Sequence, residues 1–412
     1  MWFLFPFYQY KIYHILVVSL LFFLSTNNIP HHIKFSPTFQ NNGTSKGKES
    51  KEQQLQVKSI RLRGLNYSPR QGPDSWGEYK CTPTQRIRSE LLKLSKLTDK
   101  LHLYILTDCD QARLLIPLAR ELGFKIFLNM WVDANPLSFQ REFEELEYLM
   151  QHNLLCYHEY DHHHQHNYHQ NHLKHRSANR GDQNVVMGIS VGSEMLYRGE
   201  VSRAQGLAYV NQVRNLLLRS HDDTTSNNEM VNKSKCGIPV TITDIDKVYA
   251  WHNSSLVVNV DFCSVNAFPF FDPKFSGQSA KDGAVDHLLH CIDPIMNEAR
   301  RLNKSFFLTE TGWPSAGTEC GAPTCAIASP EDQIAYFTDF YCKVHVAQPD
   351  LQYFWFNGFD AAWRRLQDAS QFSVEGHFGM LEEDGQMKRH FRELSFTCPD
   401  YSGDKTYRMP KL

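Results

Sequence analysis

Short runs of Val, Ile, Phe and Tyr alternate along the chain with segments whose apolar residues recur at helical spacing. Each run predicts a strand: 60–66, 101–107, 125–131, 185–191, 238–243, 257–268, 305–310 and 352–357. The helical spacing predicts helices over 84–97, 111–122, 137–151, 202–219, 285–301 and 330–346. Strands that alternate with helices indicate βα units and a parallel sheet.

The number of predicted strands indicates how this sheet closes. Eight strands between residues 57 and 398 fit an α/β fold, the (β/α)8 TIM barrel with insertions. A doubly wound open sheet is the alternative, and it often opens with a Gly-rich dinucleotide turn. The first predicted strand ends instead in Asn66-Tyr67-Ser68-Pro69, so the barrel is favoured.

The two ends of the chain differ from this alternating pattern. Residues 15–24 form an apolar run of the length of a signal-peptide core, so 1–26 is a cleaved signal peptide or an uncleaved signal anchor; a buried helix is the third interpretation. The first two deliver the chain to the secretory lumen, as a secreted or membrane-anchored protein. Residues 27–56 are polar and predict a linker, 57–398 the folded barrel domain, and 399–412 a C-terminal tail.

A histidine-rich tract interrupts the barrel pattern. Eight histidines fall within 158–175, inside a polar stretch that runs to residue 183. Clustered histidines can bind transition metals. The alternative is a disordered low-complexity insertion over 158–183, which we favour because in a barrel it would lie on the N-terminal face, away from the chemistry.

Composition narrows the classes of function. Lys and Arg number 43 against 45 Asp and Glu, so a net charge of −2 does not favour nucleic-acid binding through the overall field. In an oxidising lumen the cysteines would be free to pair. Candidate pairs are Cys320 with Cys325 and Cys81 with Cys109, and Asn-x-Ser/Thr acceptors occur at Asn42, Asn66, Asn232, Asn253 and Asn303.

Two carboxylates end otherwise apolar strands, Glu194 and Glu310. In a barrel the carboxyl ends of the strands and the loops that follow them build the active site. A pair of rim ion pairs would explain these residues without catalysis. Two carboxyls across a cleft lined with Trp and Tyr are, however, what cleavage of a glycosidic bond requires. The folded part holds no G-x-S-x-G, P-loop, H-E-x-x-H or G-x-G-x-x-G motif.

Six segments carry a resemblance to a known family. They are GLNYSPRQGPDSW (64–76), LTDCDQ (106–111), VGSEMLYRGE (191–200), IPVTITDID (238–246), ETGWPSAG (310–317) and YFWFNGFDAAWR (353–364). Together they resemble the fungal branch of glycoside hydrolase family 17, which acts on β-1,3-glucan of the cell wall. The leader, the linker and the histidine tract lie outside the match.

The resemblance implies a (β/α)8 barrel that hydrolyses β-1,3-glucan with retention of configuration. Glu194 would be the acid/base and Glu310 the nucleophile, with carboxyls about 5–5.5 Å apart. The pKa of Glu194 should then be raised, while Glu310 stays ionised. The residues expected to shape the sugar subsites are Tyr67, Tyr104, Ser193, Phe268, Trp313, Trp355 and Arg364.

Some positions depart from the family pattern. Ser193 stands where the family often has Asn, whose amide can hold a sugar hydroxyl in the transition state. His102 replaces an Arg, and Asn357 and Ala361 stand where acids are often found. The two glutamates remain, so the sequence predicts an active β-1,3-glucanase that needs no metal or organic cofactor. A β-1,3-glucanosyltransferase and a wall protein that binds glucan without cleaving it are the alternatives.

Overall fold

The computed structural model describes residues 57–71, 80–155, 184–218, 237–251, 255–321, 325–367, 370 and 372–412. They belong to one compact unit, Gln54–Leu412. The predictions for the N-terminal segment, the linker, the insertion over 158–183 and the acceptors Asn42, Asn232 and Asn253 lie outside the described residues. Among the helices that are described, none has the length and the apolar sequence needed to cross a bilayer.

Eight parallel strands close into a barrel in the order β10-β11-β2-β5-β6-β7-β8-β9. The predicted (β/α)8 barrel is therefore confirmed. The strands are β2 (Leu65–Asn66), β5 (Lys100–Leu103), β6 (Lys125–Met130), β7 (Val186–Ser193), β8 (Val240–Ile245), β9 (Cys263–Asn266), β10 (Phe306–Thr311) and β11 (Gln352–Trp355).

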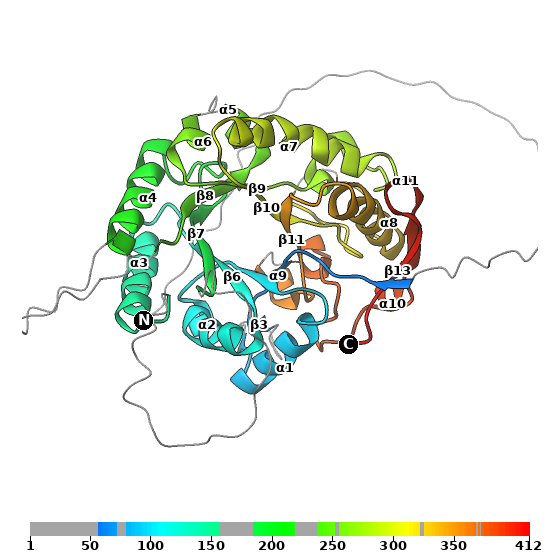
Figure 1. Ribbon diagram of the computed structural model, residues 1–412, viewed down its shortest axis with the longest axis horizontal. Coiled ribbons are helices and arrows are strands. Elements are labelled where there is room, and N and C mark those ends of the chain that lie inside the picture. The colour runs from blue at the N-terminus through cyan, green and yellow to red at the C-terminus, as the bar shows by residue number, and fades with distance from the viewer. Residues whose placement is uncertain are drawn as a thin grey trace, which may run out of the picture. The chain divides into compact units, whose positions relative to one another are not determined.

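Helices surround the barrel, as the view along it shows (Figure 1). They are α1 (Thr84–Leu94), α2 (Gln111–Leu122), α3 (Pro136–Gln151), α4 (Arg203–Leu218), α5 (Asp246–Trp251), α6 (Ser255–Asn259), α7 (Ala284–Arg301) and α8 (Pro330–Phe340), whereas α9 (Ala362–Gln367) lies inside this ring in the same view. Two helix ends follow clear sequence signals: Gly123, in a left-handed conformation with φ 80°, ends α2, and Ser329 accepts a hydrogen bond from the Asp332 amide to begin α8. A six-residue π-helical segment, Tyr341–Val346, continues α8.

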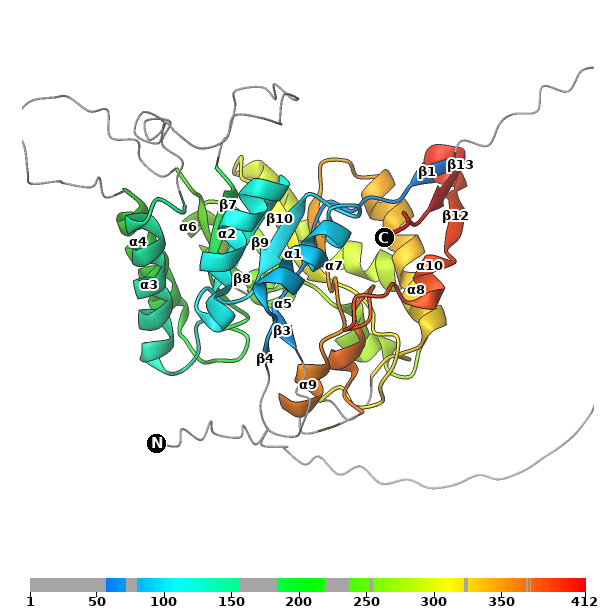
Figure 2. The same cartoon turned by 90° about the horizontal axis from the view of Figure 1, so that it is seen from below.

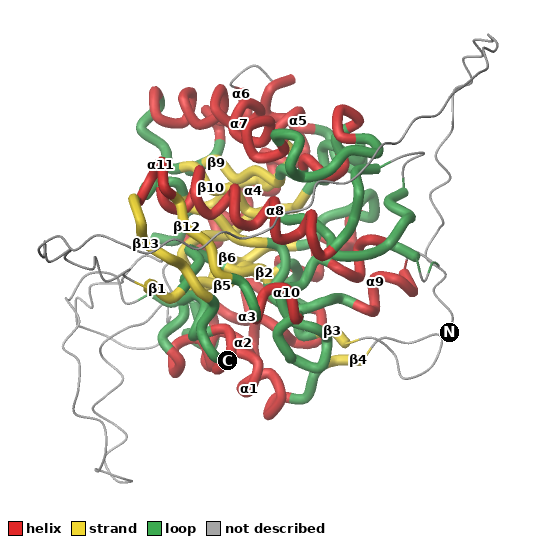
Figure 3. Tube along the Cα trace, turned by 90° about the vertical axis from the view of Figure 1, so that its right-hand side faces the viewer, coloured by secondary structure: helices red, strands yellow, loops and turns green. Residues whose placement is uncertain are grey.

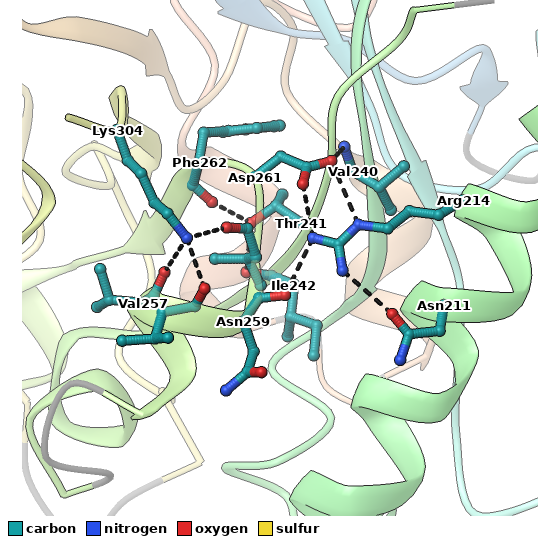
Figure 4. A network of polar contacts seen from close by, with 12 residues as sticks. Asn211, Arg214, Val240, Thr241, Ile242, Val257, Asn259, Asp261, Phe262 and Lys304 are labelled. Atoms are coloured by element: carbon teal, nitrogen blue, oxygen red, sulfur yellow. Dashed lines mark hydrogen bonds and ion pairs between the residues drawn. The ribbon is translucent and has the colours of Figure 1, made fainter. Parts of the chain in front are cut away.

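The structure corrects one predicted strand. Residues 257–268 were expected to be one continuous strand, but Val257 and Val258 belong to α6 and the strand β9 begins only at Cys263. A short apolar run does not distinguish a strand from a buried helix turn. Lys304 then fixes the end of α6, because its Nζ donates to the carbonyls of Val257, Val258 and Val260 at 2.8, 2.6 and 2.6 Å (Figure 4).

The C-terminal residues are part of the fold and not a free tail. β13 (Gly403–Arg408) pairs in parallel with β1 (Val57–Ser59) and antiparallel with β12 (Ser395–Cys398). This three-stranded sheet lies beside the barrel (Figure 3). A disulfide between Cys342 and Cys398 joins it to the segment after α8. The boundary predicted at residue 398 therefore cuts through a sheet.

Disulfides close two loops as the sequence predicted. Cys81 pairs with Cys109, and Cys320 with Cys325. Within the described residues the free thiols are Cys263 and Cys291. Cys81 belongs to a small antiparallel ribbon, β3 (Arg70–Gln71) and β4 (Lys80–Cys81), which lies with α9 at the same end of the barrel, opposite β1 and β13 (Figure 2).

Aromatic rings fill the barrel interior at one end. Phe127, Phe262 and Phe354 are buried there and pack with Phe307 and Met187. Nearer the carboxyl ends of the strands the buried interior side chains become polar: Asn66, His102, Asn129, Ser190, Thr243, Ser264, Asn266 and Thr309. The interior is thus a packed core beneath a polar layer, on which the mouth of the barrel is built.

Candidate active site

Glu194 follows β7 at the mouth in an unusual backbone conformation. Its φ is +58°, in the left-handed region, and Gly192 before it has φ +80°. A non-glycine residue in this region costs roughly 1–2 kcal/mol and persists where neighbours fix it. Two hydrogen bonds do so: the Glu194 amide donates to the Thr243 carbonyl, and the Arg198 amide donates to the Glu194 carbonyl, each at 3.0 Å. The turn thus aims Glu194 away from the strand.

Arg198 ties this turn to its surroundings. Its Nη1 donates to the Ser193 carbonyl at 2.9 Å and its Nε to Glu200 Oε2 at 2.8 Å. The guanidinium also lies over the ring of Trp131, 4.7 Å from the centroid, just beyond β6. These contacts explain the spacing in VGSEMLYRGE, because the residues after Glu194 hold the carboxylate in place.

Glu310 lies in β10, and its side chain is 8% exposed. The strand pairing shifts register around it. The shift lies between Leu308 and Thr311 in the pairing with β11, and between Leu308 and Glu310 in the pairing with β9. Gly312 follows closely, and a Cβ there would lie 2.0 Å from the Phe356 carbonyl oxygen. Only glycine allows this approach of β10 and β11, so the Gly in ETGWPSAG is required by packing.

The side chain of Asn266, from β9, lies between the two glutamates. Its Nδ2 donates to Glu194 Oε1 at 3.0 Å and to Ser193 Oγ at 3.1 Å. Asn266 also lowers the pKa of Glu310, so Glu310 lies close to the same amide. The strand ends therefore bring the two predicted carboxylates to one polar group, as the sequence expected of residues at this end of a barrel.

Burial gives Glu310 a raised pKa. The charges of Glu194 and Glu375 add to the rise, while Arg364 and the hydrogen bond from Asn266 oppose it. The sequence placed the raised pKa on Glu194 and expected Glu310 to stay ionised, so the structure reverses the expectation for Glu310. The physical reason is that β10 places Glu310 deep in the barrel beside other carboxylates.

Asp244, at the end of β8, lies beneath the Glu194 turn. Its Oδ2 accepts a hydrogen bond from the Leu196 amide at 2.9 Å, and its Oδ1 accepts one from Ile245 at 2.9 Å. Burial raises the pKa of Asp244 to about 7, and the charge of Glu194 adds to the rise. Asp244 thus couples electrostatically to the turn that it anchors.

Four of the predicted sugar-contact residues lie at the mouth. Ser193 bonds Asn266, and Phe268 packs edge-on against Phe356, with ring centroids 5.4 Å apart. The Tyr104 ring meets Phe356 at 6.2 Å, and the charge of Glu310 contributes to raising the pKa of Tyr104, which burial raises most. Arg364 donates to Glu375 Oε2 at 3.0 Å and acts on Glu310 through its charge.

The other three predicted contacts are core residues. The Tyr67 hydroxyl donates to Glu90 Oε2 at 2.7 Å and only 1% of the side chain is exposed. Trp313 and Trp355 are fully buried. Trp313 donates to the Ile327 carbonyl at 2.8 Å, whereas Trp355 packs on the α8 side of its strand. None of the three presents a face to a sugar in this conformation.

The interior histidine that departs from the family pattern is also a packing residue. His102 is fully buried, and its Nδ1 lies 2.7 Å from Asn66 Nδ2. Burial lowers the pKa of His102 to about 3, so the ring is neutral. Asn66 itself is fully buried in the barrel, so its Asn-x-Ser sequence is not an accessible glycan acceptor in the folded chain.

The sequence interpretation did not assign roles to Asn266, Asp244 or Glu375. Each is polar and lies at a strand end or in the loop after the last strand, so the signal was present in the sequence. Within the described residues, no group of three His, Cys, Asp or Glu side chains is arranged to hold a metal ion.

Residues 64–379 match the family model described as the BtgE/BtgC glycoside hydrolase domain. The chain belongs to this glycoside hydrolase family. The resemblance to glycoside hydrolase family 17 is confirmed by its structural neighbours. A family 17 β-1,3-glucanosyltransferase from Rhizomucor miehei has a TM-score of 0.57 at 26% identity, over 80% of this chain and 96% of that one. An active-site mutant of the Rhizomucor miehei enzyme in complex with laminaritriose has a TM-score of 0.58 at 25% identity, with the same coverage.

The curated relatives of this glycoside hydrolase differ in how much of their own length this chain covers. A probable glucan endo-1,3-β-glucosidase, btgC, of Aspergillus flavus is 22% identical over 346 residues, which are 79% of this chain and 42% of the relative. A glucan 1,3-β-glucosidase of Saccharomyces cerevisiae is 22% identical over 308 residues, 75% of this chain and 85% of the relative. The chain thus spans less than half the length of the Aspergillus relative.

Proposed function

We propose that this glycoside hydrolase cleaves β-1,3-glucan through a covalent glycosyl-enzyme intermediate. The observation that carries the proposal is that Glu194, after β7, and Glu310, near the end of β10, both interact with the side chain of Asn266. The printed names of the relatives, glucan 1,3-β-glucosidases and a β-1,3-glucanosyltransferase, support glucan as the substrate.

The shared amide supports retention of configuration. The Asn266 amide donates to Glu194 Oε1 at 3.0 Å and also lowers the pKa of Glu310, so both carboxyls lie beside one side chain. Retaining glycosidases need carboxyls about 5–5.5 Å apart, whereas inverting enzymes leave about 6.5–9.5 Å for a water molecule. Two carboxyls beside one amide favour the shorter separation of a retaining enzyme.

The reaction would use the two carboxyls in turn. Glu310 attacks the anomeric carbon while Glu194 protonates the leaving oxygen, and Glu194 then deprotonates the acceptor that releases the sugar. A buried pair of like charges holds a proton more firmly than two separate carboxyls. In the first step Glu194 gives this proton to the leaving oxygen. Ser193, Tyr104, Phe268 and Arg364 would contact the sugars around the pair.

Transfer to a second sugar is the alternative outcome of the same intermediate. The aromatic rings of Phe268, Phe271, Phe356 and Phe378 pack together at the mouth, with Phe271 37% exposed. Such a surface can stack on a sugar acceptor. The name of the Rhizomucor miehei neighbour, a glucanosyltransferase, also favours this alternative.

We place the protein outside the cell, as a secreted or cell-wall protein. The disulfides of the described domain suit an oxidising compartment. The apolar N-terminal segment would be its signal peptide or anchor, and Asn303, which is exposed, is an acceptor to which a glycan could attach.

Product analysis tests the activity. Linear β-1,3-glucan oligosaccharides are incubated with the protein and with the Glu310→Gln variant, and the products are separated by length. Shorter products that the variant does not make would establish hydrolysis, and longer ones would establish transfer. If neither sample changes the substrate, the enzyme proposal is wrong and a glucan-binding wall protein is the better account.

Azide tests which glutamate has which role. With an activated aryl β-glucoside, azide can replace the missing nucleophile in Glu310→Ala and give an α-glycosyl azide. In Glu194→Ala the intermediate still forms, and azide then gives a β-glycosyl azide. The opposite configurations would reverse the assigned roles.

A further inference from the structure

Asn266 offers fewer N–H groups than the acceptors around it can take. The side chain is 1% exposed, and its Nδ2 carries two hydrogens. They bond Ser193 Oγ at 3.1 Å and Glu194 Oε1 at 3.0 Å, and Asn266 also acts on Glu310, whose pKa it lowers. The three acceptors therefore compete for two N–H groups, and a stronger hydrogen bond to one acceptor weakens the bond to another.

A chain of hydroxyls fixes which way this amide points. Thr309 Oγ1 donates to Asn266 Oδ1 at 2.9 Å, and Ser264 Oγ donates to Thr309 Oγ1 at 3.3 Å. Ser264 Oγ also lies 2.6 Å from Thr243 Oγ1. A hydroxyl has one proton, so Thr243 is the donor of that last bond. Rotating the amide by half a turn would set its N–H groups against the Thr309 proton.

We propose that Asn266 is a positioning residue whose amide passes one N–H between Glu310 and Glu194 as negative charge moves between their carboxyls. The proposal rests on the proposed function. Hydrogen bonds to a charged oxygen are roughly twice as strong as those to a neutral one, so an N–H with two carboxyls in reach follows the charge.

The charge does move in both half-reactions. First, Glu310 bonds the anomeric carbon and loses its charge, the glycosidic bond breaks, and Glu194 gives its proton to the leaving oxygen and becomes anionic. Then water or a sugar hydroxyl attacks the anomeric carbon, gives its proton to Glu194, and displaces Glu310 as a carboxylate. Each step discharges one carboxyl and charges the other, and Ser193 Oγ takes the N–H that neither needs.

Other charged or titratable groups face the pair but keep their positions in these steps. Asp244 comes from β8, Arg364 from α9, Glu375 from the 3-10 turn at Val374–His377, and Tyr104 follows β5. They set a constant field at the two carboxyls. Asn266 differs from them because its donor serves Ser193 and Glu194 and has Glu310 in reach.

Two threonine substitutions test the proposal without touching a carboxyl or the amide. Thr309→Val removes the hydroxyl that orients Asn266, so we expect kcat to fall about tenfold with little change in KM, and Thr309→Ser to restore most of it. Asn266→Ala should lower kcat about 100-fold. Thr241→Val is the matched control, because the Thr241 hydroxyl bonds the Phe262 carbonyl, at 2.6 Å, and not Asn266.

The pH dependence separates this role from a general loss of structure. Losing the amide donor raises the pKa of Glu310 further, so the acid limb of kcat/KM should move to higher pH in Thr309→Val and Asn266→Ala, and not in Thr241→Val. The same shift should appear without substrate. Because the pKa of Glu310 is raised in the folded state, Tm falls as Glu310 ionises, and in the two variants this fall should extend to higher pH.

The outcomes of these measurements are distinct. Wild-type protein that makes no product contradicts the proposed function, and the Tm measurements still decide whether the amide controls Glu310. Unchanged acid limbs and unchanged Tm profiles in both Thr309→Val and Asn266→Ala would overturn the inference, even if the wild-type protein is an active glucanase.

Discussion

The two ends of the barrel treat their charges in opposite ways. At the amino ends of β8 and β9, Asp261 receives both the Arg214 guanidinium, at 2.7 Å, and the Val240 amide, at 2.8 Å, while Lys304 caps α6 (Figure 4). At the carboxyl ends, Glu310 is buried with the charges of Glu194 and Glu375 acting on it. One end pairs its charges, whereas the other, besides the ion pair of Arg364 and Glu375, keeps the like charges of Glu194 and Glu310 together.

This difference indicates what each end is for. Charges with fixed partners stabilise the fold, because a buried polar group left without a bond costs about 1–3 kcal/mol. Like charges held together cost stability and supply chemical reactivity, which is how catalytic carboxyls acquire altered pKa values. Substitutions at the mouth should therefore remove activity and spare stability, and those at the opposite end should do the reverse.

The largest expected effect is at the mouth. Glu310→Gln should lower turnover by about 1,000-fold or more, while Tm at neutral pH should equal or exceed that of the wild type. The pKa of Glu310 is raised in the folded state, so its stabilising contribution is complete below the pKa of the unfolded chain and is lost as pH rises through the folded value.

The variant should thus melt with a flatter dependence on pH than the wild type. Calorimetric melting between about pH 4 and 8, together with the product assay, measures both effects. A variant that melts several degrees lower than the wild type at every pH would mean that Glu310 stabilises the fold, and the comparison between the two ends would fail.

The next effect is at the opposite end. Lys304→Met keeps the aliphatic stem but removes the donor to the carbonyls of Val257, Val258 and Val260. We expect the free energy of unfolding to fall by about 1–3 kcal/mol, with turnover per folded molecule unchanged. Chemical denaturation measures the loss, and Lys281→Met, at an exposed position in a loop, is a control that should stay within about 0.5 kcal/mol.

The same contrast decides how much of the molecule the sequence could predict. The period of the apolar residues gave the order of strands and helices, because a barrel repeats one local unit. It failed at 257–268, where a valine run forms α6, and at the C-terminus, where β13 pairs with β1, far away in sequence. Short apolar runs and long-range pairing carry little local signal.

The site was predictable in its carboxylates and less so in its aromatic residues. Glu194 and Glu310 are polar residues at apolar strand ends, so their place followed from the fold. Strand β11 is buried on both faces, and its sequence does not alternate. Nothing local indicates that Phe356 faces the mouth, whereas Trp355 faces α8, so Trp355 was wrongly assigned to the sugars.

A smaller effect tests the field at the mouth with two opposite changes. Arg364 lowers the pKa of Glu310 and Glu375 raises it, and the two are joined by a hydrogen bond of 3.0 Å. Arg364→Met should move the acid limb of kcat/KM to higher pH, because Glu310, the proposed nucleophile, then ionises only at higher pH, and Glu375→Gln should move it to lower pH. Profiles measured with one oligosaccharide give both directions, and shifts of the same sign in both variants would contradict this account.

The smallest effect is the coupling within the ion pair of Arg214 and Asp261. Their side chains are 25% and 40% exposed, so solvent screens them and a double-mutant cycle with Arg214→Gln and Asp261→Asn should give about 0.2–1 kcal/mol. High salt should reduce this coupling further. The corresponding cycle with Glu194→Gln and Glu310→Gln should have the opposite sign, because there each single change relieves repulsion. A favourable coupling between the two glutamates would show that the mouth pairs its charges as the other end does.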